Sequence, residues 1–163
     1  MRLTWLVMAA VLSTGVVSAD EGQTWGERLA ESTMADHPEL WSMRKSDGVF
    51  RWAYTQGLVG LGMVRLSHKH GDPTYFDYAK AFVDHYVEAD GTIRTLALDE
   101  FSIDSINAGK LLFHLLDETG DGRYRRAADT LRRQIEWQPR TRNRVFWHKR
   151  KYPWQVWLDG LYM

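Results

Sequence analysis

The C-terminal stretch of the chain holds most of the side chains that could carry out chemistry. From Phe146 to Met163 it reads F-W-H-K-R-K-Y-P-W-Q-V-W-L-D-G-L-Y-M, and it contains three of the eight tryptophans. Its one carboxylate, Asp159, has apolar neighbours, and a charged group is costly to bury unless it is paired or used. Asp159 is therefore the leading candidate for a catalytic acid. The alternative is a structural carboxylate that pairs with one of the nearby cations.

A second carboxylate, Asp104, begins a predicted helix in the segment F-S-I-D-S-I-N. Taken alone, it is explained as a charge at a helix N-terminus, where an aspartate is favourable by about 0.5–2 kcal/mol. The pattern I-D-S-I around it nevertheless matches L-D-G-L around Asp159. If the two groups share a cavity, apolar neighbours and mutual repulsion both favour a protonated carboxyl group, which a general acid needs.

His148 lies in a predicted loop that is rich in cations and aromatic residues. A lone histidine is more often structural than functional. Trp147, Trp154 and Trp157 could stack on the faces of sugars, although tryptophans at such spacing are more often part of a core. The segment 139–153 has no acidic residue and six cations: Arg140, Arg142, Arg144, Lys149, Arg150 and Lys151. Such a loop is either simply solvated or attracts an anionic substrate.

Other chemistries have little support in the sequence. His68 and His70 lack further clustered ligands, and there is no H-E-x-x-H motif, so we expect no metal site. There is no P-loop or G-x-S-x-G motif, and G-L-V-G-L-G lies within a predicted helix, so no nucleotide cofactor is expected. The 21 cationic and 21 anionic side chains balance, which indicates neither a nucleic-acid nor a membrane partner.

Helical periodicity dominates the chain, and no strand-like alternation persists. Gly57, Gly60 and Gly62 are expected to allow another helix or a ligand to approach closely, since glycine in a helix otherwise costs about 1 kcal/mol. Pro153 is the expected start of a last helix, which would put Asp159 beyond its first turn. The pattern predicts five earlier helices, over Thr24–Met34, Phe50–Leu66, Thr74–Val87, Asp104–Leu116 and Tyr124–Trp137.

An internal repeat organises these helices. A shift of about 49 residues places Gly71-Asp72 on Gly120-Asp121, so that each unit is a helical hairpin with a Gly-Asp turn. Hairpins of this kind cannot bury their apolar faces alone and must pack side by side, as an open solenoid or as a closed ring. In a ring the N-terminal ends of the inner helices open at one rim, so Asp104 and Asp159 would face one cavity.

The N-terminus has the pattern of a secretory signal peptide. Arg2 precedes the apolar run Leu3–Leu12, and the small residues Val17-Ser18-Ala19 follow. Cleavage after Ala19 would leave residues 20–163 as a periplasmic or secreted protein; the alternative is a helical N-terminal extension. Because the chain has no cysteine, its stability must come from packing alone.

The C-terminal motif F-W-H-K-x-x-Y-P-x-Q-x-W-L-D-G-L-Y-M resembles the signature of the unsaturated rhamnogalacturonyl hydrolases of glycoside hydrolase family 105. The related unsaturated glucuronyl hydrolases of family 88 share a weaker form of it. The segments W-x-Y-x-x-G-L, D-G-x-I-R, I-D-x-I-x-x-G-K and P-R-T are also similar to that family. The resemblance implies an all-α (α/α)6 barrel. Such a barrel needs six hairpins and the chain supplies about two and a half, so residues 20–163 are expected to be the N-terminal half and to be inactive alone.

The resemblance also implies a reaction and roles for individual residues. Asp159 would protonate the double bond of a 4,5-unsaturated uronic acid, and Asp104 would orient or tune it, without metal or cofactor. The expected substrate is an unsaturated galacturonyl-rhamnose from pectin. Three alternatives stay open: an unsaturated glucuronyl hydrolase acting on glycosaminoglycan fragments, a sugar epimerase or isomerase, and a non-catalytic helical-repeat module. The sequence does not address the oligomeric state. The expected substrate-binding residues are His148, Trp157, Trp147 and Tyr54.

Overall fold

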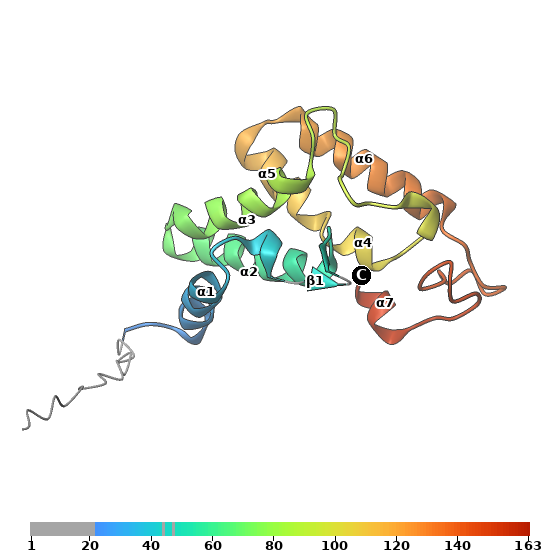
Figure 1. Ribbon diagram of the computed structural model, residues 1–163, viewed down its shortest axis with the longest axis horizontal. Coiled ribbons are helices and arrows are strands. Elements are labelled where there is room, and N and C mark those ends of the chain that lie inside the picture. The colour runs from blue at the N-terminus through green and yellow to red at the C-terminus, as the bar shows by residue number, and fades with distance from the viewer. Residues whose placement is uncertain (1–21, 44, 47) are drawn as a thin grey trace, which may run out of the picture.

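The computed structural model describes residues 22–43, 45–46 and 48–163 and consists mainly of helices (Figure 1). The predicted signal peptide, residues 1–19, lies outside the described residues. In the part of the chain that is described, no helix is long and apolar enough to cross a membrane. The helices are α1 (Trp25–Asp36), α2 (Tyr54–His70), α3 (Pro73–Tyr86), α4 (Asp104–Asn107), α5 (Lys110–Thr119), α6 (Gly122–Trp137) and α7 (Leu158–Tyr162), with short 3-10 helices at Leu40–Ser42 and Leu98–Glu100.

Two helical hairpins, α2–α3 and α5–α6, pack side by side and form the body of the molecule (Figure 1). Their turns are built alike. Gly71 and Gly120 end α2 and α5 in the left-handed conformation, with φ of 71° and 69°. Asp72 and Asp121 then cap the following helices by accepting hydrogen bonds from backbone N–H groups two residues later. The predicted all-α hairpin fold is confirmed, whereas the length of the repeat remains a prediction.

The core forms along the stripes that helical periodicity predicts. On α3 the apolar residues at helical spacing from Tyr75 to Tyr86 form a buried stripe. On α5, Leu111, Leu112 and Leu115 have no exposed surface. The stripe on α6 is less completely buried: Tyr124 and Leu131 lie in the core, whereas Ile135, one turn after Leu131, is 37% exposed. It lines a pocket at the C-terminal end of the helix instead.

Glycines in α2 allow the helix to approach the α4–α5 junction. A Cβ atom at Gly57 would lie 2.5 Å from the Cα of Ala108, and one at Gly60 would lie 2.8 Å from a methyl carbon of Leu111. These two positions confirm the predicted close approach: a side chain at Gly57 would displace backbone, and one at Gly60 would require the side chain of Leu111 to move. Gly62 faces open space, and no described helix approaches it.

Two helix starts and one helix interior differ from the sequence prediction. Phe50 belongs to a short antiparallel pair, β1 (Lys45–Ser46) and β2 (Val49–Phe50), and α2 begins only at Tyr54. The predicted helix over Asp104–Leu116 is broken between α4 and α5. The break occurs where a Cβ at Gly109 would lie 2.3 Å from Leu131, so the chain turns tightly there to pass the neighbouring helix.

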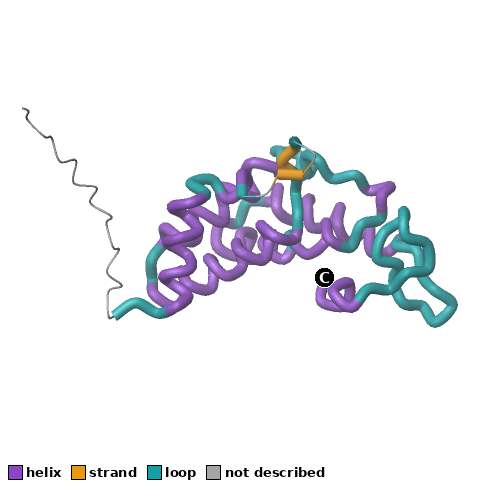
Figure 2. Tube along the Cα trace, turned by 60° about the horizontal axis from the view of Figure 1, so that its bottom comes forward, coloured by secondary structure: helices purple, strands orange, loops and turns teal. Residues whose placement is uncertain are grey.

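The last helix also begins later than predicted. Pro153 lies within a turn instead of starting a helix, and this turn is closed by the N–H of Gln155, which donates to the carbonyl of Tyr152 at 3.2 Å. Trp154 adopts a positive φ of 67°, which a helix does not allow. Helix α7 therefore starts at Leu158. Figure 2 shows the long loop that precedes it gathered at one end of the molecule.

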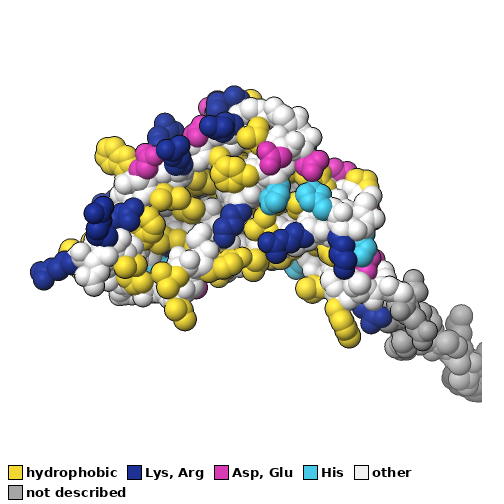
Figure 3. All heavy atoms as spheres, turned by 180° about the vertical axis from the view of Figure 1, so that it is seen from behind, with side chains coloured by type: hydrophobic (Ala, Val, Ile, Leu, Met, Phe, Trp, Pro, Cys, Tyr) yellow, Lys and Arg dark blue, Asp and Glu magenta, His cyan; other side chains and the backbone are white. Residues whose placement is uncertain are grey.

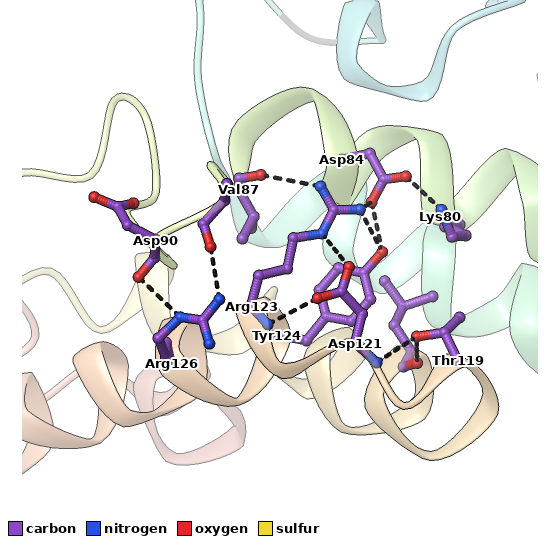
Figure 4. A network of polar contacts seen from close by, with 11 residues as sticks. Lys80, Asp84, Val87, Asp90, Thr119, Asp121, Arg123, Tyr124 and Arg126 are labelled. Atoms are coloured by element: carbon purple, nitrogen blue, oxygen red, sulfur yellow. Dashed lines mark hydrogen bonds and ion pairs between the residues drawn. The ribbon is translucent and has the colours of Figure 1, made fainter.

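A polar network joins α3 to the start of α6 (Figure 4). One carboxylate oxygen of Asp84 accepts from the guanidinium of Arg123 and from the hydroxyl of Tyr124, both at 2.6 Å. Its other oxygen pairs with Lys80 at 2.5 Å. The hydrogen bond from Lys80 to Asp84 raises the pKa of the lysine, and burial, followed by the bond to Asp84, raises the pKa of Tyr124. This network fixes the two hairpins against each other.

Apolar side chains also reach the surface, and Figure 3 shows many of them on the back face, interrupted by a few cationic and histidine side chains. The most exposed in the described chain include Leu158 at 86% and Trp25 at 82%. Leu58 of α2 and Phe113 of α5 are also exposed, at 48% and 57%. The described residues thus leave parts of the helix surfaces uncovered.

Candidate active site

Three segments meet at the start of α4: the helix itself, the loop over residues 138–157, and α7. The loop is fixed to the helix start because the N–H of Ile103 donates to the carbonyl of His148 at 3.1 Å. The N–H of His148 in turn donates to the carbonyl of Gln155 at 2.9 Å, which brings the end of the loop alongside. Trp157 is the N-cap of α7, and Asp159 lies in its first turn. The long loop therefore carries Asp159 back to Asp104.

The two predicted aspartates lie on either side of one imidazole ring. His148 places Nε2 3.4 Å from Oδ1 of Asp104, and Nδ1 3.9 Å from Oδ1 of Asp159. Lys149 pairs with the other oxygen of Asp104 at 2.5 Å. The structure thus brings together two carboxylates that are far apart in the sequence, as the ring arrangement requires. Their catalytic roles remain predictions.

Burial differs sharply within this group. The side chain of His148 is 1% exposed and that of Asp104 is 19% exposed, whereas Asp159 is 53% exposed. The expectation that apolar neighbours bury the carboxylate of Asp159 is therefore wrong. Trp157 stacks on the imidazole of His148 instead, with ring centres 4.1 Å apart and an interplanar angle of 11°.

The predicted substrate-binding residues lie in different places. Tyr54 lines a pocket of about 200 Å³ at the N-terminal ends of α2 and α4, together with Asp104 and Lys149. His148 contacts the aspartates and Trp157, and its burial leaves little surface for a sugar. Trp147 packs on Trp154, with ring centres 4.8 Å apart, and does not line that pocket. Substrate contact by these residues remains a prediction.

A second pocket, of about 220 Å³, lies behind His148 and Trp157. Its walls are mostly apolar and come from α4, α6, α7 and the loop between the last two. Ile106, Ile135 and Leu161 are among the lining side chains. A pocket of this composition suits packing, whereas the polar pocket beside Tyr54 suits a sugar.

Asp104, His148 and Asp159 are also the one group in the described chain whose donor atoms lie close enough to hold a metal, all within 4.8 Å of one another. The two ring nitrogens of His148, however, point to different carboxylates, and only one of them could bind an ion. Lys149 also occupies one oxygen of Asp104. A positive charge is therefore already present at the pair, and the arrangement suits proton chemistry better than metal binding.

Sequence reasoning gave no individual role to several residues that build this site. Lys149 is one of six cations in the segment 139–153, and its position next to His148 is the one sequence feature that distinguishes it from the other five. Gln138, buried at 4% exposure, donates hydrogen bonds to the carbonyls of Phe101 and Trp147. Gln56 is fully buried and lines the pocket beside Tyr54. Glutamines carry no periodic or motif signal, so no pattern could have identified these two.

Comparisons with known proteins relate the chain to two families of glycoside hydrolases. Residues 25–163 match the family model described as Glycosyl Hydrolase Family 88. A solved structure of a family 105 glycoside hydrolase from C. acetobutylicum ATCC 824 superposes with a TM-score of 0.77 and 38% sequence identity. The match covers 86% of this chain and 37% of that chain, so this chain spans little more than a third of the length of that relative. The protein thus belongs to Glycosyl Hydrolase Family 88, and its hairpins have the helical toroid fold that this family shares with family 105.

Proposed function

We propose that this protein is a glycosidase that removes a 4,5-unsaturated uronic acid from the non-reducing end of an oligosaccharide. The family assignment supports the reaction class. The observation that carries the proposal is the placement of Asp104 and Asp159 on opposite nitrogens of His148, with Asp104 and Lys149 lining an open pocket. Two carboxylates held this way, one exposed and one paired with a lysine, provide an acid that can reach a substrate and a partner that is fixed.

In the proposed reaction the substrate double bond is hydrated. Asp159 delivers its proton to C4, and the electron pair of the C4=C5 bond forms the new C–H bond. The ring oxygen stabilises the cation that develops at C5. The carboxylate of Asp159 then takes a proton from water as the water oxygen adds to C5. The resulting hemiketal opens and releases the leaving sugar, so no displacement occurs at the anomeric carbon.

The chain supplies a distinct contribution from each side of the pair. Asp159, with 53% exposure, can reach a sugar ring and a water molecule. Asp104 is held by its ion pair with Lys149, so in the proposed reaction it orients the reacting groups while Asp159 donates the proton. In the basic loop, the exposed Arg142 and Arg144 provide positive charge that would attract the uronate carboxylate.

We propose an unsaturated galacturonyl-rhamnose from pectin as the preferred substrate. The 38% identity to a family 105 hydrolase over most of this chain supports that choice. The match to the family 88 model favours an unsaturated glucuronide from glycosaminoglycans as the second candidate. The predicted signal peptide, if cleaved, would place either reaction outside the cytoplasm.

The test uses the full-length protein and its Asp159→Asn variant on both disaccharides, with loss of the ultraviolet absorbance of the double bond as the measurement. We expect kcat of the variant to fall by about 10²–10⁴-fold, the usual contribution of a general acid. The control is Asp99→Asn, which removes a carboxylate that is 81% exposed and pairs only weakly with Arg150. A wild-type protein that consumes neither disaccharide would rule out the function, and an unaffected Asp159→Asn variant would rule out the role of Asp159.

A further inference from the structure

We propose that Gln138 is a positioning residue of the active site, whose buried amide fixes the two chain segments that carry Asp104 and His148. The structural part of this inference stands on geometry, and its catalytic consequence rests on the proposed function. Gln138 follows the last residue of α6 and is 4% exposed. It lies outside every sequence motif that pointed to the site.

The amide nitrogen of Gln138 joins the two segments directly. It donates one hydrogen bond to the carbonyl of Phe101 at 2.7 Å and another to the carbonyl of Trp147 at 2.9 Å. Phe101 lies three residues before Asp104, and Trp147 immediately precedes His148. An amide has two N–H groups, and both are used here. One nitrogen therefore sets the distance between the loop before α4 and the loop after α6.

Phe101 shows why such a hold is needed. Its φ is 45°, in the left-handed region that residues with a Cβ atom rarely adopt. A conformation of this kind persists only where the surrounding structure enforces it. The carbonyl of this same residue is the acceptor for Gln138. The turn it makes directs the chain into α4 and so sets the direction from which Asp104 enters the site.

A second buried glutamine one turn earlier orients the first. Gln134, 3% exposed, donates to the carbonyl of Ser102 at 2.9 Å and approaches Oε1 of Gln138 at 3.4 Å. With its oxygen facing this donor, the amide of Gln138 has its nitrogen directed at the two carbonyls. The last turn of α6 thus holds consecutive carbonyls of the loop that leads to Asp104.

Both N–H groups of the Gln138 side chain donate to backbone carbonyls, so Gln138 affects the site by positioning these segments and not by contacting a substrate. Replacing it with leucine, which has a similar shape, would leave two buried carbonyls without a donor. The segments of Phe101 and Trp147 would then separate, and His148 would lose its fixed place between the aspartates and under Trp157. The polar network at the other end of α6 would remain intact, about 22 Å away along the helix axis at 1.5 Å per residue.

The experiment compares Gln138→Leu with the wild-type protein and with Asp84→Asn, which weakens the network between α3 and α6. Two properties are measured: kcat and KM on the unsaturated disaccharide, and the ring resonances of His148 in histidine-labelled protein, assigned with a His148→Gln variant. We expect Gln138→Leu to lower kcat at least tenfold with KM changed less than about threefold. The resonances of His148 should lose the ring-current shift from Trp157. Asp84→Asn should lose stability but keep both properties.

The two readouts separate failure of this inference from failure of the proposed function. If the wild-type protein has no activity on the disaccharides, the resonances of His148 alone decide. Gln138→Leu with wild-type kcat or an unmoved His148 spectrum would overturn the positioning role. If Gln138→Leu does not fold, Gln138→Asn serves instead, because its amide is one methylene shorter and cannot reach both carbonyls. It should change both properties in the same direction, and unchanged values would equally overturn the inference.

Discussion

The molecule contains two clusters of charged and polar side chains, and the central group of each is hydrogen-bonded to a different degree. In the α3–α6 network, Asp84 accepts from Arg123 and Tyr124 at 2.6 Å. At the active site, the imidazole of His148 lies 3.4 Å and 3.9 Å from the two aspartates, and its Nδ1 is buried without a hydrogen-bond partner. Buried polar groups in folded proteins are normally paired, and exceptions mark sites kept for another purpose.

This difference is the one we expect between a cluster that holds the fold and a cluster with the proposed catalytic role. The α3–α6 network joins the two hairpins through short hydrogen bonds, and the acceptor oxygens of Asp84 already have their partners. The cluster around His148 is held in place from outside, by Gln138 and by the bond between Ile103 and the carbonyl of His148. Within it Lys149 pairs closely with Asp104, whereas the imidazole of His148 has no carboxylate oxygen of the described residues nearer than 3.4 Å. A group that gains or loses a proton during turnover must keep a site for that proton that is not occupied by a strong hydrogen bond in the resting protein.

The strongest test of this contrast replaces Asp104 with asparagine. The change keeps the shape but removes the charge that pairs with Lys149 and faces His148. We expect kcat to fall by about 10²-fold or more, because Asp159 loses the partner that orients it, while the urea midpoint changes little. Steady-state rates on the disaccharide and a urea titration measure the two effects. Equal losses of stability and activity would mean that Asp104 is structural, like Asp84.

The converse change, Asp84→Ala, should act on stability alone. It leaves the guanidinium of Arg123 and the hydroxyl of Tyr124 without their shared acceptor in a partly buried place. The expected loss is about 2–3 kcal/mol in the free energy of unfolding, since a broken charge pair leaves its partner uncompensated. Urea unfolding measures it, and kcat on folded protein should match the wild type. A fall in kcat of tenfold or more would show that the two clusters are coupled.

Glycine substitutions in α2 sharpen the comparison at the packing that lies between the clusters. Gly57→Ala would place its Cβ 2.5 Å from the Cα of Ala108, just after α4. Because backbone must move to make room, we expect a loss of about 1–3 kcal/mol. The matched control is Gly62→Ala, which faces open space and should stabilise the helix by about 0.5–1 kcal/mol. Thermal unfolding of both variants tests this, and a neutral Gly57→Ala would refute the close packing.

Much of the helical body follows from the sequence because its determinants are local. The α3 stripe repeats every three or four residues, and the Gly-Asp turns combine a left-handed C-cap with an aspartate N-cap within two positions. Asp104 and Asp159 were paired by comparing repeats, which works because equivalent helices start at the same rim. Local patterns were sufficient for the α3 stripe and the Gly-Asp turns, where the residues that interact are close in the sequence.

The remaining features of the site could not be predicted because they depend on distant contacts. Pro153 is a good helix starter in isolation, but the loop is held by Gln138 through the carbonyl of Trp147, and α7 starts later. His148 was expected at the pocket surface, and its burial depends on Trp157 folding over it. The sequence next to His148 does not predict this stacking. The burial and contacts of these residues depend on where the long loop packs against α4, and a periodic pattern of hydrophobic residues does not predict that position.

Alkaline pH should affect the helical body through its buried tyrosines, and this is the smallest effect we expect. Burial, with a smaller contribution from the carboxylate of Glu39, raises the pKa of Tyr78 from 10.0 to about 12. Between pH 10 and about 12 the unfolded chain releases a proton that the folded protein keeps, so the free energy of unfolding falls as pH rises through this window.

The variant Tyr78→Phe tests this, because phenylalanine cannot ionise in either state. It also loses the hydrogen bond from the hydroxyl to the carbonyl of His37, which lowers stability equally below pH 10. Urea midpoints at several pH values from 9 to 12 should therefore fall less steeply for the variant than for the wild type. Parallel slopes would mean that Tyr78 ionises alike in both states, and that the alkaline sensitivity of the fold arises elsewhere.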